Sequence, residues 1–377
     1  MEKISKQSIN VLMLGDSLSK QGGIVTLEKH MLKYAPSDIQ IQHIGTAVDG
    51  SAIQKACGFA IALVRVVLVL LTAKIDIVHM HVAERGSAYR KSIVTLIAKF
   101  VFRKPVLLHS NSPEFHEFYQ GLSPNVQRGL LWAFCQCDRF LAVSDRWRNF
   151  YVDKFGLKPE QVLVLANPIE LPERVPQRER SNQINLVFLG RIGQRKGAFD
   201  LIRAFALLPE PVRERANLVL AGDGEIEKAR DLVTSYSSNI SNIGDRITIY
   251  NWLNSEQRDA LLAKADIFAL PTYNEGLPLA LLEAMGWGLP VITTPVGGIP
   301  DIITSNSNGL LINPGDLQQL YKAMQSLIRD DRLRFSLGSN ARASVATFDI
   351  KNYYISLRKI YDSILELEQS EYAKITQ

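Results

Sequence analysis

The sequence predicts an α/β protein built from two parallel-sheet domains in succession. The chain has 377 residues, and at roughly 150 residues per domain this length suggests two domains. Short apolar runs typical of buried strands alternate with longer helical patterns along the chain. A polar segment with two prolines, residues 170–183, separates six such runs from six more. These three observations together favour two doubly wound domains joined by a linker.

The first half of the chain holds six apolar runs of strand length. Such runs are typical of strands that helices cover on both faces of a parallel sheet. We therefore predict one parallel α/β domain over residues 1–169. The runs are INVLMLG (9–15), IQIQHIG (39–45), IDIVHMHV (75–82), KPVLLHS (104–110), RFLAVS (139–144) and QVLVLAN (161–167).

The most apolar helical pattern of this half covers residues 56–73. It is the only candidate for a membrane span, but Arg65 and Thr72 interrupt it, and a span needs about 20 mostly apolar residues. We therefore expect a buried crossover helix there. The apolar run that follows the two lysines at the start of the chain is too short for a signal peptide, so export is not expected.

The second half repeats the alternation after residues 170–183, which hold six charges and are expected to form a solvated linker. The pattern predicts a second parallel α/β domain over residues 184–345. Residues 349–369 place apolar side chains at helical spacing and predict a final helix. The runs are INLVFLG (184–190), ANLVLAG (216–222), RITIYNW (246–252), ADIFALP (265–271), LPVITTP (289–295) and NGLLINP (308–314).

Ligands of open α/β sheets bind beyond the carboxyl ends of the strands, so the strand-to-helix junctions are the places to search. After the first run, Gly22 and Gly23 precede a helical pattern and could admit an anion to the helix N-terminus. A flexible turn is the alternative. After residues 184–190, the loop GRIGQRKG carries Arg191 and Lys196. The guanidinium of Arg191 can donate two parallel hydrogen bonds, and the ammonium of Lys196 is a compact positive charge, so together they suit a diphosphate. A solvated basic loop is the alternative there.

The junction after residues 265–271 carries two carboxylates. Glu275 lies in the loop, where it could touch a sugar, and Glu283 lies in the following helix, where it could accept both hydroxyls of a ribose. Apolar residues surround Glu283, which favours a buried and paired carboxylate over a solvated one. The backbone N–H groups of Gly276 and Leu277 could meet phosphate or sugar oxygens.

Histidines gather near the ends of two runs of the first domain. His79 and His81 are two residues apart and share one face of their strand. They could be two zinc ligands, but a third and fourth are not evident, so we expect no metal; polar packing or acceptor binding is favoured. We expect the neutral imidazole of His109 to project into the cleft and bond a ligand hydroxyl, with a core histidine as the alternative.

Composition and missing motifs exclude several classes. With 46% hydrophobic and 21% charged residues, the chain is not disordered. Three cysteines are too few for a disulfide framework and suggest a reducing cytoplasm. The net charge is +5, but no zinc finger or RNP-like run accompanies it, so nucleic acid is not expected. Serine hydrolase, zincin, P-loop and kinase motifs are absent, as is GxGxxG.

Four motifs occur in the order and spacing of a known family. They are GRIGQRKG, NEGLPLALLEAM with both glutamates, PVGGIPDII and GLLINPGD. In combination they resemble the retaining glycosyltransferases of family 4, as found in bacterial polysaccharide biosynthesis. The resemblance covers nearly the whole chain and implies the GT-B fold, with two facing Rossmann-like domains and an interdomain cleft. Residues 1–169 would form the acceptor side, 184–345 would bind the nucleotide sugar, and the helix within 346–377 would pack back on the first domain.

The resemblance also implies what the residues of the second domain do. Arg191 and Lys196 would hold the diphosphate of the donor and neutralise the leaving group. Glu283 would bind the ribose hydroxyls, and Glu275 would contact the transferred sugar, with Gly276, Leu277 and Pro278 lining that site. No metal or other cofactor is expected, since two cations do the work that a divalent ion does elsewhere.

In the first domain, Gly22 and Gly23 would close on the phosphates, and His109 would touch the donor sugar near the reacting carbon. The implied reaction moves a hexose from a UDP-sugar, or second from GDP-mannose, to a glycan or lipid-linked acceptor. Two alternatives stay open: a nucleotide-sugar epimerase of the same fold, and a non-catalytic subunit of a partner enzyme. Asn251 and Trp252 stand where the family often has glycine, in the predicted base pocket.

The positive charge is concentrated in residues 51–104, which carry nine Lys and Arg against two acids, a net +7. Lys91, Thr95, Lys99 and Arg103 fall four apart on one stripe of a predicted helix. A basic amphipathic helix beside a very apolar one is typical of a membrane-surface face. We expect this segment to bind an anionic membrane, peripherally on its inner face, with an ordinary solvated helix as the alternative.

Overall fold

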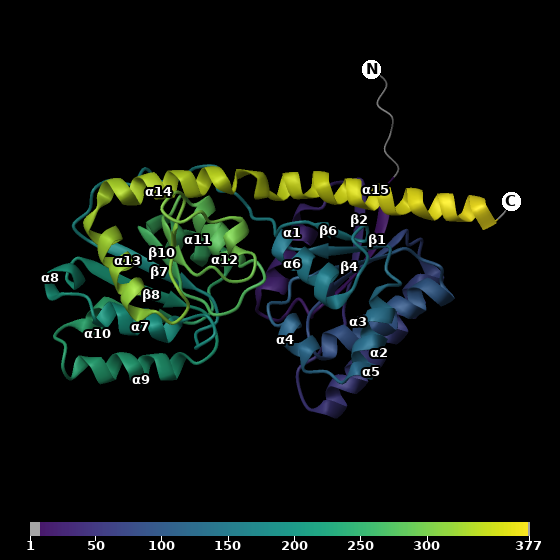
Figure 1. Ribbon diagram of the computed structural model, residues 1–377, viewed down its shortest axis with the longest axis horizontal. Coiled ribbons are helices and arrows are strands. Elements are labelled where there is room, and N and C mark those ends of the chain that lie inside the picture. Colours follow the sequence, from purple (N-terminus) through teal and green to yellow (C-terminus); the bar gives the residue numbers. More distant parts are fainter. Residues whose placement is uncertain (1–7, 376–377) are drawn as a thin grey trace, which may run out of the picture. The chain divides into compact units, whose positions relative to one another are not determined.

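The computed structural model describes residues 8–375, with side chains described as far as residue 368, and the chain divides into two compact units (Figure 1). Unit 1 comprises Met1–Pro168 and Ile350–Gln377, and unit 2 comprises Ile169–Asp349. The expected linker, residues 170–183, belongs to unit 2. Within it the guanidinium of Arg178 donates hydrogen bonds to the carbonyls of Leu262, Ala265 and Trp287.

Unit 1 is built on a six-stranded parallel sheet in the order β2-β1-β3-β4-β5-β6. All six predicted runs form strands. The inner strands β1, β3 and β4 are buried almost throughout under helices, whereas the edge strand β2 alternates buried and exposed side chains. The strands are β1 (Ile9–Gly15), β2 (Ile39–Gly45), β3 (Ile77–Val82), β4 (Val106–Ser110), β5 (Arg139–Ala142) and β6 (Val162–Val164).

The helices of unit 1 connect these strands in the βαβ manner. The connection from β1 to β2 runs in the opposite direction across the sheet from the later connections, so right-handed crossovers place its helix on the opposite face. The helices are α1 (Gly23–Tyr34), α2 (Ala52–Thr72), α3 (Gly86–Leu96), the π-helix η1 (Ile97–Val101), α4 (Phe115–Gln120), α5 (Pro124–Phe134), α6 (Asp145–Asn149) and the π-helix η2 (Phe150–Phe155).

The predicted final helix is α15 (Ile350–Ile375), which belongs to unit 1 although it follows unit 2 in the sequence. The Tyr354 hydroxyl donates to the carbonyl of Met31 on α1, and Arg358 donates to Asp38 at 2.8 Å. On unit 2, the amide of Ile169 donates to the carbonyl of Phe348 at 2.9 Å. The chain therefore enters and leaves unit 2 at adjacent points.

Unit 2 repeats the design with a six-stranded parallel sheet in the order β12-β11-β10-β7-β8-β9. Each of its predicted runs forms a strand. The strands are β7 (Ile184–Leu189), β8 (Ala216–Ala221), β9 (Ile247–Tyr250), β10 (Ile267–Leu270), β11 (Val291–Thr293) and β12 (Leu310–Leu311). The helices are α7 (Ala198–Ala206), α8 (Glu210–Arg213), α9 (Ile226–Ser237), α10 (Ile243–Arg246), α11 (Ser255–Lys264), α12 (Leu279–Gly286), η3 (Ile299–Asp301), α13 (Leu317–Arg329), α14 (Asp331–Ser344) and η4 (Ala346–Phe348).

Two expectations for residues 51–104 are wrong. The apolar crossover helix α2 is largely exposed instead of buried, with only Ala62, Val66 and Leu70 covered. The stripe of Lys91, Thr95, Lys99 and Arg103 is not a basic surface: Lys91 and Thr95 are buried, Lys99 pairs with Asp138 at 2.8 Å, and Arg103 lies beyond the helix with φ 51°. The physical reason is that Lys91 and Lys99 find hydrogen-bonding partners inside the unit, while the outward positions are apolar.

Candidate functional site

The loop with the two predicted cations connects β7 to α7 in unit 2. Gly197 caps α7 with φ 73°, in the left-handed region that glycine tolerates best. A Cβ at this position would lie 2.0 Å from the carbonyl oxygen of Pro271. Glycine therefore lets the loop press its backbone against the residues that follow β10.

The two loops are bonded to each other along their length. The amide of Tyr273 donates to the carbonyl of Arg195 at 2.8 Å, and Arg195 Nη1 donates to the carbonyl of Asn274 at 3.0 Å. The Tyr273 hydroxyl donates to Asp200 on α7 at 2.6 Å, and Gln194 donates to that hydroxyl at 3.1 Å. The residues from Gln194 to Asp200 are thus held in one geometry relative to the loop that carries Glu275.

Lys196 and Glu275 are brought together by this docking. The ammonium of Lys196 donates to Oε1 of Glu275, and both side chains are mostly buried. Arg191 differs: it is exposed, and the described part of the chain offers its guanidinium no hydrogen bond or ion pair. The structure therefore presents on the same loop one cation fixed by a carboxylate and one guanidinium without a bonded partner, and both groups are able to bind phosphate oxygens.

The residues after Glu275 are buried under the loop that follows β11. The amide of Gly298 donates to the carbonyl of Gly276 at 2.7 Å. Gly297 has φ 56°, and a Cβ there would lie 1.8 Å from the carbonyl oxygen of Glu275. The paired glycines of PVGGIPDII thus allow close backbone contact with the segment Glu275 to Pro278.

Glu283 is buried and paired, as its apolar neighbours predict. It lies on α12, and Arg258 of α11 donates to its Oε1 at 2.6 Å. Burial raises the pKa of Glu283 to about 7, although the nearby Arg258 lowers it. A carboxylate held by one cation at one oxygen can accept hydroxyl donors at the other. Arg258 could not be predicted from the sequence, because it lies in a short helix with no motif around it.

In unit 1, Gly22 and Gly23 lie where the sequence places them, at the N-terminus of α1. Gly22 is its N-cap, and its carbonyl accepts hydrogen bonds from the amide and the hydroxyl of Thr26, each at 3.0 Å. A Cβ at either glycine would meet no atom within 4 Å. The helix N-terminus is therefore open to a ligand on this side.

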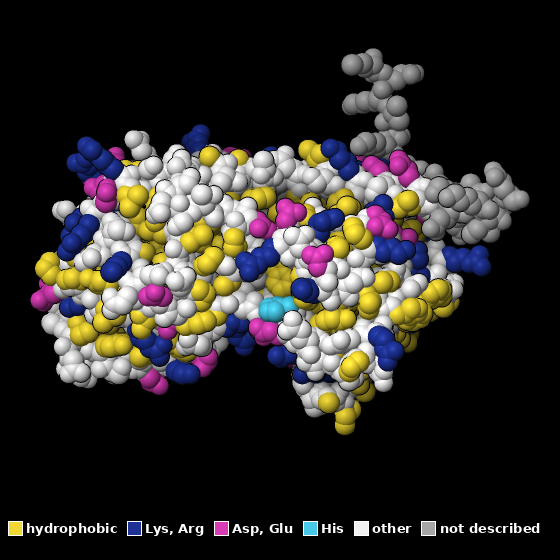
Figure 2. Space-filling view, in the orientation of Figure 1, with side chains coloured by type: hydrophobic (Ala, Val, Ile, Leu, Met, Phe, Trp, Pro, Cys, Tyr) yellow, Lys and Arg dark blue, Asp and Glu magenta, His cyan; other side chains and the backbone are white. Residues whose placement is uncertain are grey.

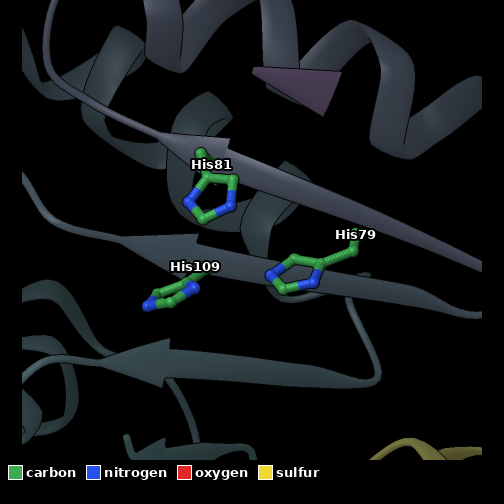
Figure 3. A group of neighbouring side chains, drawn as sticks. All are labelled: His79, His81 and His109. Carbon is green, nitrogen blue, oxygen red and sulfur yellow. The ribbon is translucent and has the colours of Figure 1, made fainter. Parts of the chain in front are cut away.

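His109 does not project into an open site, contrary to expectation. It is fully buried on β4 with its ring 4.9 Å from that of His81 and 5.5 Å from that of His79, both on β3 (Figure 3). Nδ1 of His79 shares a 2.8 Å hydrogen bond with the Tyr361 hydroxyl of α15. Among residues 8–368, Nε2 of His79 and both nitrogens of His81 and His109 have no partner. The three side chains lie on one sheet face because alternate strand residues point the same way.

These three histidines supply the third metal-ligand candidate that the sequence did not reveal. Their potential ligand atoms lie within 4.8 Å of one another. The rings of His79, His81 and His109 are stacked or tilted by only 21–34°. An imidazole nitrogen binds a metal in its ring plane, so rings stacked in this way must turn before they can share one ion. In the observed geometry the cluster packs as a stack of neutral rings.

Burial of this cluster predicts acid sensitivity. Desolvation lowers the pKa of His109 to about 3 and lowers those of His79 and His81 well below 6.5. Below pH 6.5 the unfolded chain binds protons that the folded chain excludes, so stability is complete above that pH and falls as the pH drops towards 3. For His109 alone we expect a loss of about 2 kcal/mol at pH 5, measured by denaturant unfolding at pH 7.5 and pH 5.

A matched pair of variants tests this origin. His109→Phe removes one titrating group and is expected to weaken the dependence of stability on pH. His116→Gln, a change at a partly exposed side chain, is expected to leave it unchanged. Equal pH dependence in the wild type and in His109→Phe would contradict the assignment.

A second polar cluster of unit 1 lies at the carboxyl ends of β1 and β2, and the sequence did not predict it. The ammonium of Lys91 donates to Thr46 Oγ1 and lies 3.5 Å from the carbonyl oxygen of Gly15. Glu28 on α1 pairs with His43 at 3.2 Å. Desolvation lowers the pKa of Lys91 to about 7, and the nearby Glu28 opposes this effect. No sequence signal separates Lys91 from a surface lysine, because its partners come from distant strands.

Comparison with known proteins agrees with this architecture. Residues 16–173 match the family described as "Glycosyltransferase Family 4", and residues 171–344 match "Glycosyl transferases group 1". The crystal structure of HepE from Anabaena in complex with UDP has a TM-score of 0.73 at 19% identity, covering 94% of this chain and 100% of that one.

Two curated relatives are similar over most of their length. An α-1,4-N-acetyl-D-galactosaminyltransferase of Campylobacter jejuni, named for a diNAcBac-PP-undecaprenol glycan, is 26% identical over 266 residues, 69% of each chain. The UDP-Gal:α-D-GlcNAc-diphosphoundecaprenol α-1,3-galactosyltransferase of Escherichia coli is 23% identical over 320 residues, 80% of this chain and 78% of that one. With both family matches, two parallel Rossmann-like sheets and the paired loops of unit 2, the chain belongs to glycosyltransferase family 4 and is a glycosyltransferase of GT-B fold.

Proposed function

We propose that this glycosyltransferase moves a hexose from a UDP-sugar to a lipid-linked or glycan acceptor of surface polysaccharide or glycolipid synthesis. GDP-mannose is the second candidate donor. The observation that carries the proposal is the docked loop pair of unit 2, which sets Lys196 against Glu275 at the N-terminus of α7, with the exposed Arg191 on the same loop. The name of the Escherichia coli relative supports the choice of a UDP-sugar, and the names of both relatives support an acceptor linked to undecaprenyl diphosphate.

The cations of the loop would stabilise the departing diphosphate. Negative charge develops on the leaving group in the transition state, and a fixed cation that needs no reorganisation stabilises it most. Glu275 and the loop bonds hold Lys196 in place, while the exposed fork of Arg191 can bind two phosphate oxygens. With both cations engaged, the departing nucleotide needs no added positive charge, so we propose that the reaction requires no metal ion.

The carboxylates would orient the rest of the donor. Glu283, paired with Arg258 through one oxygen, would accept hydrogen bonds from the ribose hydroxyls, and Glu275 would contact the transferred sugar beside the buried segment Gly276 to Pro278. Retention of the anomeric configuration is part of the proposal and rests on the resemblance of the motifs to the retaining glycosyltransferases.

Product analysis tests the reaction directly. The full chain is incubated with UDP-hexoses or GDP-mannose, with and without an undecaprenyl diphosphate-linked glycan, in the presence of EDTA. We expect an extended glycan only with both substrates, with the anomeric configuration of the donor preserved in the NMR spectrum. Accumulation of an epimer from donor alone would favour an epimerase. Loss of product on chelation, or no product from any donor, would contradict the proposal.

Nucleotide binding gives a second prediction. A ligand at 100 times its Kd adds about 2.7 kcal/mol of stability, so UDP is expected to raise the melting temperature of the chain more than GDP or ADP does. Glu283→Gln should reduce this shift, because the amide replaces one acceptor oxygen with a donor. Glu256→Gln, an exposed change on α11, should preserve the shift. No shift with any nucleotide would contradict the site.

A further inference from the structure

The outward face of α2 is an exposed apolar surface that the proposed reaction does not use. Ile61, Val64, Leu68 and Leu71 follow one another at helical spacing and are each more than half exposed. Within the described residues, α2 is the one helix long and apolar enough to cross a membrane by length and composition. An exposed apolar face of this length is costly in water and marks a surface that another phase or molecule covers.

The topology excludes a spanning orientation. The helix connects β2 to β3, and both strands pair with β1 in the same sheet, so its two ends must stay beside that sheet. Ala62, Val66 and Leu70 lie one turn apart and bury the inner stripe of α2 in unit 1. A membrane crossing would pull these side chains out of the core. The exposed stripe can enter an apolar phase only if the helix lies along its surface.

A second apolar patch lies on the same face of the sheet. Three connections of unit 1 advance in the same direction across the sheet, which places their helices on one side of it. These connections contain α2, α3 with η1, and α5. Phe100 and Val101 of η1 and Trp132 of α5 are exposed, and the rings of Phe100 and Trp132 stack with a centroid distance of 6.3 Å. Figure 2 shows hydrophobic side chains gathered over the part of unit 1 where Figure 1 labels these helices.

Charges of one sign border this surface. Lys55, Arg65, Lys74 and Arg103 are exposed, and no acidic residue occurs between residues 51 and 75. The hydroxyl of Thr72, the one neutral polar side chain towards the end of α2, is bonded to the carbonyl of Leu68 at 2.7 Å. Protein interfaces carry about one hydrogen bond per 100–200 Å² of buried area. This face offers too few polar side chains to form hydrogen bonds at that density with a protein partner. Two copies face to face would also oppose like charges.

We propose that the face formed by α2, Phe100, Val101 and Trp132 docks unit 1 on an anionic membrane, with α2 lying in the plane of the interface. An apolar stripe flanked by basic side chains and an interfacial tryptophan are the features of such a surface. This inference deepens the proposed function, since it names the phase from which a lipid-linked acceptor would be taken. It replaces the basic stripe predicted from the sequence with an apolar face and four flanking cations.

Co-sedimentation of the full chain with vesicles tests the docking without any sugar present. We expect binding to vesicles of phosphatidylcholine with phosphatidylglycerol and weak binding to phosphatidylcholine alone. The double variant Leu68→Gln and Leu71→Gln should lower the affinity about tenfold or more, and Arg65→Gln with Lys74→Gln about fivefold per charge. Ile355→Gln, at an exposed position of α15 in the same unit, is the matched control and should bind like the wild type.

Several results would contradict the docking proposal. Equal binding to both vesicle types, no binding, or unchanged binding of the Leu68→Gln, Leu71→Gln variant would overturn the proposal. A concentration-dependent dimer in light scattering that this variant abolishes would assign the face to a second copy. Retention of the chain in vesicles after an alkaline carbonate wash would overturn the in-plane orientation. The shift of melting temperature with UDP should be equal in wild type and variant, so a failure here is separable from a failure of the donor site.

Discussion

Replacing Arg191 by alanine is expected to lower turnover about 10²- to 10³-fold, equivalent to about 3–4 kcal/mol of lost transition-state stabilisation. The guanidinium is exposed and bonded to nothing in the described part of the chain, so the substitution leaves no buried partner behind. The melting temperature should therefore stay close to that of the wild type. Turnover is measured with saturating donor, so that weaker binding is not mistaken for slower chemistry.

Two further variants define what Arg191 contributes. Arg191→Lys keeps the positive charge but loses the two parallel hydrogen-bond donors of the guanidinium. Its turnover should therefore lie between those of Arg191→Ala and the wild type. Arg230→Ala removes an exposed arginine of the same unit that pairs with Glu227 on α9, and should retain full activity. Wild-type turnover in Arg191→Ala would contradict the diphosphate clamp.

Lys196 gives the same test with a different structural consequence. Its loss leaves the buried carboxylate of Glu275 without its cation, which is costly in itself. Lys196→Ala should therefore lower both turnover and melting temperature. Adding Glu275→Gln should restore part of the stability but none of the turnover, which separates the chemical contribution of the lysine from the structural one.

Gly197→Ala is expected to have the largest effect on stability, about 2–5 kcal/mol. The φ of 73° is unfavourable for alanine, and the added methyl group would lie 2.0 Å from the backbone carbonyl of Pro271. Either the loop of Arg191 and Lys196 or the loop of Glu275 must move. Denaturant unfolding measures the loss, and turnover should fall even at temperatures where the chain stays folded.

Gly193→Ala is the control within the same loop. Its Cβ would come no nearer than 3.0 Å to Glu225 Oε1, at the end of a half-exposed side chain that can move aside. We expect a loss of less than about 1 kcal/mol. Similar losses in Gly193→Ala and Gly197→Ala would show that loop flexibility, and not the contact with Pro271, limits stability.

The strands were predictable because their signal is local. Each of the twelve apolar runs lies between turn residues and has the length of a strand, and each forms one in the structure. The faces of the helices were harder to predict. The apolar composition of α2 suits a buried crossover and a membrane surface equally, and only the packing of unit 1 shows which side chains are covered.

The residues of the candidate site also differ in how far the sequence predicts them. Lys196, Glu275 and Glu283 carry a motif signal. The structure buries Glu283, as predicted, and it also places Lys196 in contact with Glu275, which the sequence did not predict. Arg258 and Lys91 carry none, because their partners lie far away in the sequence. His109 was expected at the surface of a site, yet the imidazoles of the neighbouring strand cover it.

The return of α15 to unit 1 has a consequence for how the chain is made. Unit 2 is one continuous segment, Ile169–Asp349, and can fold as soon as it leaves the ribosome. His79 must wait for Tyr361, which is synthesised 282 residues later. At about 5–20 residues per second this delay is roughly 15–55 seconds. During that time α1 lacks its cover of α15, so the apolar side chains of unit 1 that α15 buries stay exposed until the end of the chain is made.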